Sequence, residues 1–181
     1  NIIAKLQNFN VNIKILPSID KIVNENFNLL SFEEVKLEDL IERNLKIDSK
    51  NIFRYIKNKN ILITGAGGSI GSELCKQIYF NNPTSIILLD NNEYNLFNID
   101  NYLTNLQNYN QKNISIIPKI TSIRNYNKIE EIFKDYNIDQ VYHCAAFKHV
   151  SLLESNIYEA FENNVTGTKN LIELSYKYNV K

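Results

Sequence analysis

The sequence predicts an α/β fold with a doubly wound sheet, and three observations support this prediction. Four apolar runs of strand length alternate with stretches whose apolar residues recur every three or four positions, as on one face of a helix. The runs are apolar throughout, which is typical of parallel strands buried on both faces. Strands that alternate with helices form βαβ units with right-handed crossovers. We therefore predict the N-terminal half of a Rossmann-type parallel sheet over residues 60–181.

Each element of this sheet has its own apolar signature. The four strands are expected at Ile61–Ile63, Ile86–Leu89, Ile114–Ile117 and Val141–Ala146. The helices between them are expected to bury three apolar stripes, namely Ile70, Leu74 and Ile78, then Leu96, Ile99, Leu103 and Leu106, then Ile129, Ile132 and Phe133. A longer helix is expected from about Ser155 to Tyr178.

Two further segments precede the predicted sheet. Residues 1–17 contain a short helical pattern and then the alternating run VNIKIL, and we interpret them as the end of an upstream α/β domain. Residues 18–59 are interpreted as a helical linker, because Ser31 is followed three residues later by Glu34, the spacing of a capping box. Since the first residue is Asn1 rather than Met, we expect the sequence to be part of a longer protein.

The composition is that of a globular protein, with 44% hydrophobic and 22% charged residues. The formal net charge is zero, so we expect no nucleic-acid partner and no broad attraction to anionic lipid. No apolar stretch of the sequence approaches the roughly 20 residues that span a bilayer. Cys75 and Cys144 lack metal-ligand spacing and are interpreted as small buried hydrophobes, so we expect no metal site and a cytoplasmic location.

The glycine-rich segment TGAGGSIG, residues 64–71, follows the first predicted strand and opens the first predicted helix. Glycine at positions 65 and 68 allows a tight turn and a close approach of the backbone to a pyrophosphate, and Gly71 allows the helix to pack closely on the strand. A phosphate would lie at a helix N-terminus, where free N–H groups attract anions. The alternative is a glycine turn without a ligand, but the strand–turn–helix context favours dinucleotide binding.

An acidic residue closes the second predicted strand. Asp90 ends the run SIILLD and lies 19 residues after Gly71, where a carboxylate accepts hydrogen bonds from the ribose hydroxyls of a dinucleotide. It would repel the 2′-phosphate of NADP, and the following Asn91 and Asn92 add no positive charge. We therefore expect NAD rather than NADP. The alternative is a solvated aspartate at a strand end.

The fourth predicted strand ends in the segment VYHCAAFKHV. Ala145 and Ala146 are small enough to let a flat ring lie against the backbone at the edge where open α/β sheets bind ligands. Lys148 and His149 follow on the same rim, and their position beside the expected nicotinamide favours a functional role over simple solvation.

Four segments of the sequence resemble a known group of proteins, namely TGAGGSIGSELCKQI, LLDNNEYNLF, HCAAFKHVSLLESN and NNVTGTKNLIE. They are similar to the extended short-chain dehydrogenase/reductase superfamily. More narrowly, they resemble the bacterial nucleotide-sugar 4,6-dehydratases that act on UDP-N-acetylglucosamine in polysaccharide and glycan biosynthesis. The resemblance covers Asp39 to Lys181. Long members of that group carry transmembrane helices and another nucleotide-binding-like domain upstream, so a parent protein anchored to the inner membrane is one expectation.

The resemblance implies roles for particular residues. Around the pyrophosphate it places Gly65, Gly68, Ser69, Ile70 and Gly71. It places Asp90 at the ribose and, along the nicotinamide, Ala145, Ala146 and Asn164. Near the sugar nucleotide it places Lys148, His149 and Glu154. The adenine position departs from the family pattern, because Ser122-Ile123 replaces an aspartate and a small hydrophobic residue. A homo-oligomeric parent protein is also implied.

The resemblance also implies a reaction. The sugar is oxidised at C4 with NAD+, water is lost across C5–C6, and the hydride returns to C6, which yields a 4-keto-6-deoxy sugar nucleotide. The catalytic acid and base of the group lie after the position of Lys181, so we expect no turnover from these residues alone. Two alternatives stay open: an epimerase or reductase of the same superfamily, which carries a Tyr-x-x-x-Lys after the fifth strand, and a non-catalytic dinucleotide-binding module.

Overall fold

The computed structural model describes residues 14–15, 33–34 and 55–180, and the chain divides into two compact units, Asn1–Ile47 and Asp48–Lys181. In the first unit, β1 (Lys14–Ile15) pairs antiparallel with β2 (Glu33–Glu34). The helix predicted around Ser31 is therefore wrong at Glu33 and Glu34, where pairing with β1 overrides the local helical pattern. The alternating run VNIKIL contains Lys14 and Ile15, which do form a strand. The other predictions for residues 1–54 lie outside the described residues.

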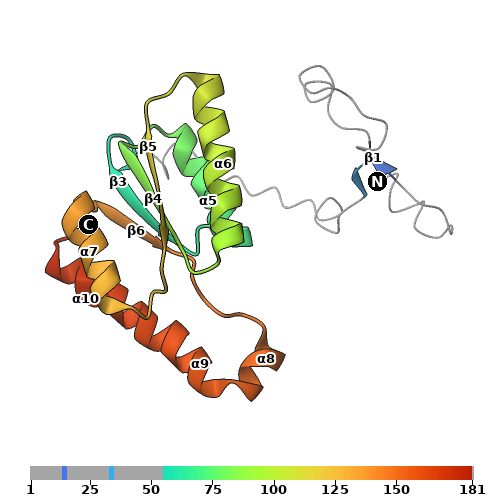
Figure 1. Ribbon diagram of the computed structural model, residues 1–181, viewed down its shortest axis with the longest axis vertical. Coiled ribbons are helices and arrows are strands. Elements are labelled where there is room, and N and C mark those ends of the chain that lie inside the picture. Colours follow the sequence, from blue (N-terminus) through green and yellow to red (C-terminus); the bar gives the residue numbers. More distant parts are fainter. Residues whose placement is uncertain (1–13, 16–32, 35–54, 181) are drawn as a thin grey trace. The chain divides into compact units, whose positions relative to one another are not determined.

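The second unit contains a four-stranded parallel sheet, which confirms the predicted fold class (Figure 1). Its strands are β3 (Asn60–Thr64), β4 (Ser85–Asp90), β5 (Ser115–Ile120) and β6 (Gln140–His143), in the spatial order β5-β4-β3-β6. The chain winds outward from β3 to β5 and then crosses back to place β6 on the other side of β3. This reversal is a topological switch point, and Thr64 pairs with both Leu89 and His143 there. Open α/β sheets bind ligands at this place.

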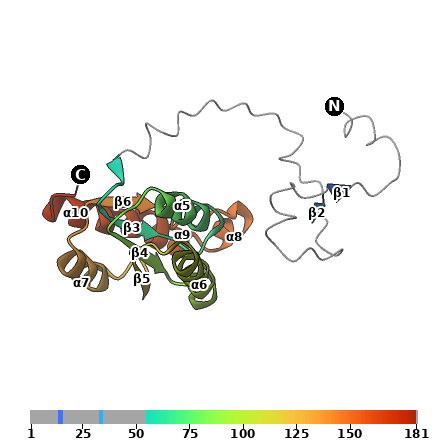
Figure 2. The same ribbon diagram turned by 90° about the horizontal axis from the view of Figure 1, so that it is seen from above.

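Helices cover both faces of the sheet (Figures 1 and 2). They are α5 (Ser69–Phe80), α6 (Glu93–Asn110), α7 (Tyr126–Tyr136), α8 (Val150–Ser155), α9 (Ile157–Phe161), the π-helical η2 (Glu162–Gly167) and α10 (Thr168–Lys177). Alternate residues of β3 face opposite layers, so that Ile61 and Ile63 pack with α5 and α6, whereas Leu62 packs with α7 and α10. The predicted helical stripes supply part of both cores, namely Ile78, Leu96, Ile99 and Leu103 in the first and Ile129, Ile132 and Phe133 in the second. The prediction that Ile70 is buried with the first stripe is wrong, because Ile70 lies in the first turn of α5 and is 70% exposed.

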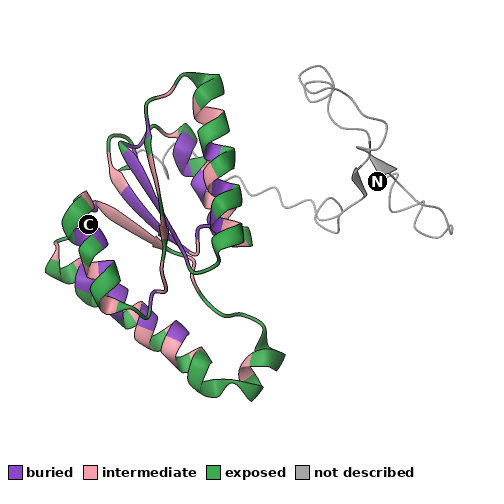
Figure 3. Ribbon diagram, viewed as in Figure 1, coloured by how far each residue is buried: buried purple, intermediate pink, exposed green. Residues whose placement is uncertain are grey.

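The burial of the outer strands and two element boundaries differ from the prediction. β3 and β4 are almost wholly buried, as expected for central strands, but β5 and β6 are partly exposed because they are the outer strands of the described sheet (Figure 3). β6 ends at His143 instead of Ala146. The long C-terminal helix begins at Ile157 and changes to π-type bonding at Glu162–Gly167.

Among the described residues, no helix combines the length and apolarity that a bilayer crossing requires.

An acidic side chain joins α7 to α10 and provides a test of the packing. Glu130 on α7 accepts hydrogen bonds from Lys177 Nζ at 2.5 Å and from Lys134 Nζ at 3.1 Å. These interactions, that of Lys177 first, lower the pKa of the Glu130 carboxyl from 4.5 to about 2. Because the folded-state pKa is depressed, the stabilisation is present above pH 4.5 and is lost as the pH falls towards 2.

We expect the Glu130→Gln variant to be less stable than the wild type at pH 7 and the difference to shrink as the pH falls from 4.5. Urea unfolding at several pH values measures this. Glu131→Gln is the matched control, because Glu131 is exposed and binds only its helical neighbour Lys128, at 2.9 Å. A constant difference for Glu130→Gln across this pH range would contradict the assignment.

Candidate functional site

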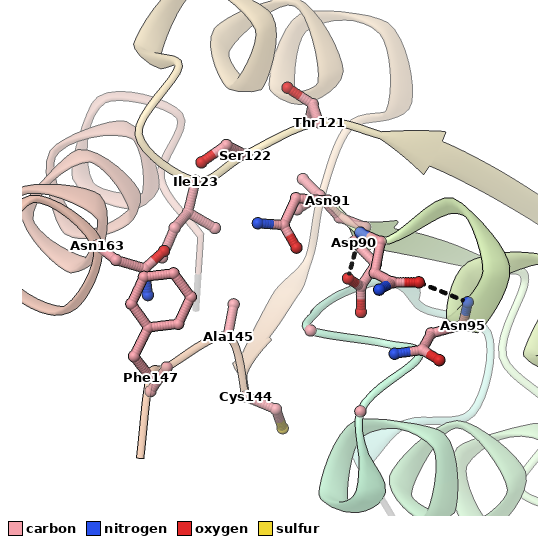
Figure 4. A pocket seen from close by; sticks show the side chains of 15 residues that line it. Asp90, Asn91, Asn95, Thr121, Ser122, Ile123, Cys144, Ala145, Phe147 and Asn163 are labelled. Atoms are coloured by element: carbon pink, nitrogen blue, oxygen red, sulfur yellow. Dashed lines mark hydrogen bonds between the residues drawn. The ribbon is translucent and has the colours of Figure 1, made fainter. Parts of the chain in front are cut away.

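A pocket of about 270 Å³ lies at the switch point, at the carboxyl ends of the strands (Figure 4). The glycine loop, the ends of β4 and β5, the segment after β6 and η2 all contribute to it. Its lining consists of Gly65, Gly68, Leu89, Asp90, Asn91, Asn92, Asn95, Thr121, Ser122, Ile123, Cys144, Ala145, Ala146, Phe147 and Asn163. The structure thus brings together seven of the residues predicted for the cofactor, namely Gly65, Gly68, Asp90, Ser122, Ile123, Ala145 and Ala146.

The glycine loop between β3 and α5 requires glycine at two positions. Gly65 has a φ of +66°, and a Cβ there would lie 2.7 Å from the backbone nitrogen of Ala145. A Cβ on Gly71, in the first turn of α5, would lie 2.0 Å from the carbonyl oxygen of Gly65. Helix α5 can therefore approach the loop this closely only because Gly71 has no side chain, and the absence of a side chain at Gly65 allows the segment after β6 to approach the loop.

Gly68 differs from these two glycines because the position of its missing Cβ is largely open. A Cβ on Gly68 would meet one neighbouring atom within 4 Å, the carbonyl oxygen of Gly65 at 3.2 Å. Gly68 is the N-cap of α5 and has no side chain that could accept the N–H groups of the first helical turn. The amide groups of the first helical turn are thus available to an anion. Ser69 and Ile70 lie in this turn but not in the pocket lining.

The carboxylate of Asp90 connects the glycine loop to α6. Its Oδ2 accepts the N–H of Gly67 at 2.9 Å, and its Oδ1 accepts the N–H of Asn92 at 2.9 Å. Asn92 in turn caps α6 by accepting the N–H of Asn95 at 2.9 Å. A Cβ on Gly67 would lie 2.5 Å from Cβ of Asn95, so α6 is also in close contact with the loop. Asp90 itself is only 8% exposed.

The ends of β4 and β5 form the side of the pocket predicted for adenine. The N–H of Thr121 donates to the carbonyl oxygen of Asp90 at 3.0 Å, and Ser122 Oγ accepts the N–H of Arg124 at 3.2 Å. Ile123 is buried against Gly167 of η2, where an added Cβ would lie 2.6 Å from the end of the isoleucine side chain. The two residues that depart from the family pattern, Ser122 and Ile123, therefore do line the pocket.

Residues 144–149, here called the rim loop, follow β6 and border two pockets. Ala146 and Phe147 line both the first pocket and a neighbouring one of about 420 Å³. The second pocket is also lined by Lys148, His149, Leu152, Leu153, Asn156 and Glu159. The predicted sugar-nucleotide residues Lys148 and His149 thus lie next to the predicted cofactor side. Glu154 is exposed on α8 and lines neither pocket.

Two neighbouring asparagines of η2 have different positions. Asn163 is 5% exposed and lines the first pocket. Asn164, the residue predicted to lie along the nicotinamide, does not line it. Its side chain instead accepts the N–H of Phe147 at 2.8 Å and donates to the carbonyl oxygen of Phe147 at 2.9 Å, which holds the rim loop. π-Type turns of this kind occur frequently at functional sites.

The two cysteines differ in burial. Cys75 is buried as predicted, but the prediction of a buried Cys144 is wrong, because Cys144 follows β6 at the pocket and is only half-buried. Burial raises the pKa of Cys75, which is fully buried, and burial also raises the pKa of Cys144, which lines the pocket. Both are therefore protonated at neutral pH and are poor nucleophiles. The described residues contain no group of three or more His, Cys, Asp or Glu side chains that could hold a metal ion.

The fold and the pocket define an α/β protein of the Rossmann type with a dinucleotide-like glycine loop. The model of the family described as "Polysaccharide biosynthesis protein" matches residues 61–181. The chain belongs to this family.

Three curated relatives show the range of similarity. The chain is 40% identical over 164 residues to the probable polysaccharide biosynthesis protein EpsC of Bacillus subtilis, covering 90% of this chain and 27% of EpsC. It is 38% identical over 159 residues to the capsular polysaccharide biosynthesis protein CapD of Staphylococcus aureus, covering 87% and 26%. It is 31% identical over 125 residues to the inverting UDP-N-acetylglucosamine 4,6-dehydratase of Campylobacter jejuni, covering 68% and 34%. The chain thus spans about a quarter to a third of these relatives.

Solved structures confirm the fold. The X-ray structure of Pen from Bacillus thuringiensis matches 70% of this chain and 38% of that protein, with a TM-score of 0.63 and 33% identity. A UDP-glucose 4-epimerase from Thermotoga maritima, solved with UDP-glucose, matches 67% of this chain and 35% of the epimerase, with a TM-score of 0.54 and 27% identity.

Several residues of the site are not predicted by the sequence pattern. Asn163 and Asn164 are adjacent in the sequence, and only the π-helical geometry assigns one to the pocket and the other to the rim loop. The sequence does indicate that Gly67 is special, because four of the five glycines lie within residues 65–71 and the motif requires only three of them. The sequence gives no comparable indication for Asn95 and Phe147, because a capped helix start and an exposed aromatic residue are common in many proteins.

Proposed function

We propose that this chain is the NAD-binding part of a nucleotide-sugar 4,6-dehydratase that acts on UDP-N-acetylglucosamine on the cytoplasmic side of the membrane. The observation that carries the proposal is the glycine loop held by Asp90 at the switch point, next to a second pocket lined by Lys148 and His149. Membership of the polysaccharide biosynthesis family and similarity to a UDP-N-acetylglucosamine 4,6-dehydratase support it.

The residues of the first pocket fit a dinucleotide. Gly68 leaves space for a pyrophosphate at the N-terminus of α5, and Asp90 retains lone pairs that can accept ribose hydroxyls. Ser122 and Ile123 would border adenine, and Ala145, Ala146 and Asn163 would border the nicotinamide. When bound, NAD supplies a hydride acceptor for C4 of the sugar and a donor for the later return. The chain's own contribution is to bind and orient, and Lys148 and His149 would face the sugar nucleotide.

The charge of the pocket favours NAD over NADP. Among its lining residues Asp90 is the one charged side chain, so a 2′-phosphate would meet an acid and no cation. We expect calorimetric titration of the chain to give an affinity for NAD at least about tenfold higher than for NADP, about 1.4 kcal/mol in binding free energy. Asn91→Arg, which adds a cation at the pocket edge, is expected to narrow the difference. Equal affinity of the wild type for both dinucleotides would contradict this view of the pocket.

The reaction itself is tested on the full-length protein that contains this chain. Incubated with UDP-N-acetylglucosamine and NAD, it should release a 4-keto-6-deoxy sugar nucleotide, detectable by mass spectrometry as the loss of water. The 181-residue chain alone should release none. A product of unchanged mass with inverted C4 would instead identify an epimerase, which the similarity to the Thermotoga epimerase makes the second candidate. Binding of NAD without any product would indicate a non-catalytic module.

A further inference from the structure

His143, at the carboxyl end of β6, bridges two threonines from different elements. Its Nδ1 lies 2.7 Å from Oγ1 of Thr64, the last residue of β3, and its Nε2 lies 3.0 Å from Oγ1 of Thr168, the first residue of α10. None of these three residues lines either pocket. Their hydrogen bonds nevertheless connect β3 and β6 of the sheet to the first residue of α10.

The direction of each hydrogen bond follows from the other partners of the threonines. Thr168 Oγ1 donates its hydrogen to the carbonyl oxygen of Asn164 at 2.7 Å, so it accepts the Nε2–H of His143. In a neutral imidazole whose hydrogen is on Nε2, Nδ1 carries no hydrogen, so Thr64 Oγ1, which also accepts the N–H of Ala145 at 3.4 Å, donates its own hydrogen to Nδ1. These roles require a neutral imidazole with its hydrogen on Nε2. Partial burial favours this neutral form because it lowers the pKa of His143.

The resulting chain of hydrogen bonds begins and ends on the rim loop. At one end is the N–H of Ala145, bound to Thr64. At the other end is Asn164, whose backbone carbonyl is bound to Thr168 and whose side chain holds both backbone groups of Phe147. Regular strand structure ends at His143, and the backbone N–H groups of the loop donate two further bonds to backbone carbonyls, from Cys144 to Thr64 and from Ala146 to Cys144. The side-chain bonds therefore contribute much of what fixes the loop.

We infer that His143 is a positioning residue of the dinucleotide site: as a neutral bridge between Thr64 and Thr168 it holds the rim loop, and with it Ala145 and Phe147, against the pocket. The consequence for NAD binding rests on the proposed function. The bridge itself is a property of the free chain and can be measured without any cofactor.

Matched threonine variants test the bridge. Thr168→Val removes the hydroxyl with little change of shape, whereas Thr168→Ser keeps it. We expect Thr168→Val and His143→Phe each to weaken NAD binding to the 181-residue chain about tenfold and Thr168→Ser to stay within about twofold of the wild type. Because both changes break one chain of bonds, the double variant should lose little more than either single variant.

Two measurements without NAD separate this inference from the proposed function. Nitrogen-15 NMR of the imidazole, assigned by its loss in His143→Phe, should show the hydrogen on Nε2 in the wild type and in Thr168→Ser but a mixed tautomer in Thr168→Val. The amide hydrogen of Phe147 should exchange about tenfold faster in Thr168→Val. A wild-type chain that fails to bind NAD would refute the proposed function, and these two measurements would still decide whether His143 holds the loop. Unchanged exchange in Thr168→Val, or equal losses of affinity in Thr168→Val and Thr168→Ser, would overturn the inference.

Discussion

Replacing Gly71 by alanine is expected to destabilise the domain by about 3 kcal/mol or more and to abolish NAD binding. The added Cβ would lie 2.0 Å from the carbonyl oxygen of Gly65 and 2.7 Å from its carbonyl carbon. Both are backbone atoms, so no side-chain rotation can relieve the overlap, and α5 must move away from β3. That movement displaces the first turn of the helix, where the phosphates are proposed to lie.

Gly68→Ala is the matched control for Gly71→Ala. Its Cβ would contact only the carbonyl oxygen of Gly65, at 3.2 Å, and would otherwise extend into open space beside the pocket. We expect a melting temperature within a few degrees of the wild type, since about 1 kcal/mol corresponds to roughly 4 °C in a domain of this size. NAD affinity should nevertheless fall at least about tenfold, a change of about 1.4 kcal/mol. Thermal melting combined with calorimetric titration separates the two effects, and a stable Gly71→Ala variant that binds NAD normally would contradict the packing argument.

The second large effect is expected for Asp90→Asn. In the aspartate, Oδ1 accepts the N–H of Asn92 and Oδ2 accepts the N–H of Gly67. The amide group of an asparagine has only one acceptor oxygen, so its NH2 group would face one of these two N–H groups and that hydrogen bond would be lost. Losing one hydrogen bond to a buried charged group costs about 1.5–3 kcal/mol. NAD affinity should fall by more than tenfold, because the variant loses both the ribose acceptor and the anchor of the glycine loop.

Urea unfolding and NAD titration of Asp90→Asn measure the two losses. Asp135→Asn is the control, because Asp135 is exposed on α7 and makes the same change in net charge away from the pocket. If Asp90→Asn and Asp135→Asn were equally stable, the anchoring role of Asp90 would be wrong. If both bound NAD as the wild type does, its ribose role would be wrong too.

The fold was predictable because its signals are local. Each strand is an apolar run and each helix carries a stripe at helical spacing, so the residues of β3, β4, α5, α6 and α7 indicate their own structure. The boundaries were harder to predict where tertiary contacts decide them. β6 stops at His143, and the rim loop that follows leads to α8 while Phe147 bonds to the side chain of Asn164 in η2. The change to π-type bonding at Glu162–Gly167 has no simple sequence signal.

The site was predictable where the backbone itself makes the contact. Gly65, Gly71 and Asp90 lie where the strand–turn–helix pattern requires them, and the structure gives each a steric or hydrogen-bonding reason. Side chains whose direction depends on helix geometry were not predictable in this way. The family resemblance predicts Asn164 along the nicotinamide, but Asn163 lines the first pocket. It predicts Glu154 near the sugar nucleotide, but Glu159 of α9 lines the second pocket and Glu154 does not.

The most direct test of the central claim is a calorimetric titration of the wild-type chain with NAD, accompanied by the stable Gly68→Ala variant. We predict one site per chain for the wild type and a markedly weaker site for Gly68→Ala. A wild-type chain that is folded by circular dichroism but gives no binding heat at any NAD concentration, and no protection against thermal unfolding, would contradict the assignment of this pocket to a dinucleotide.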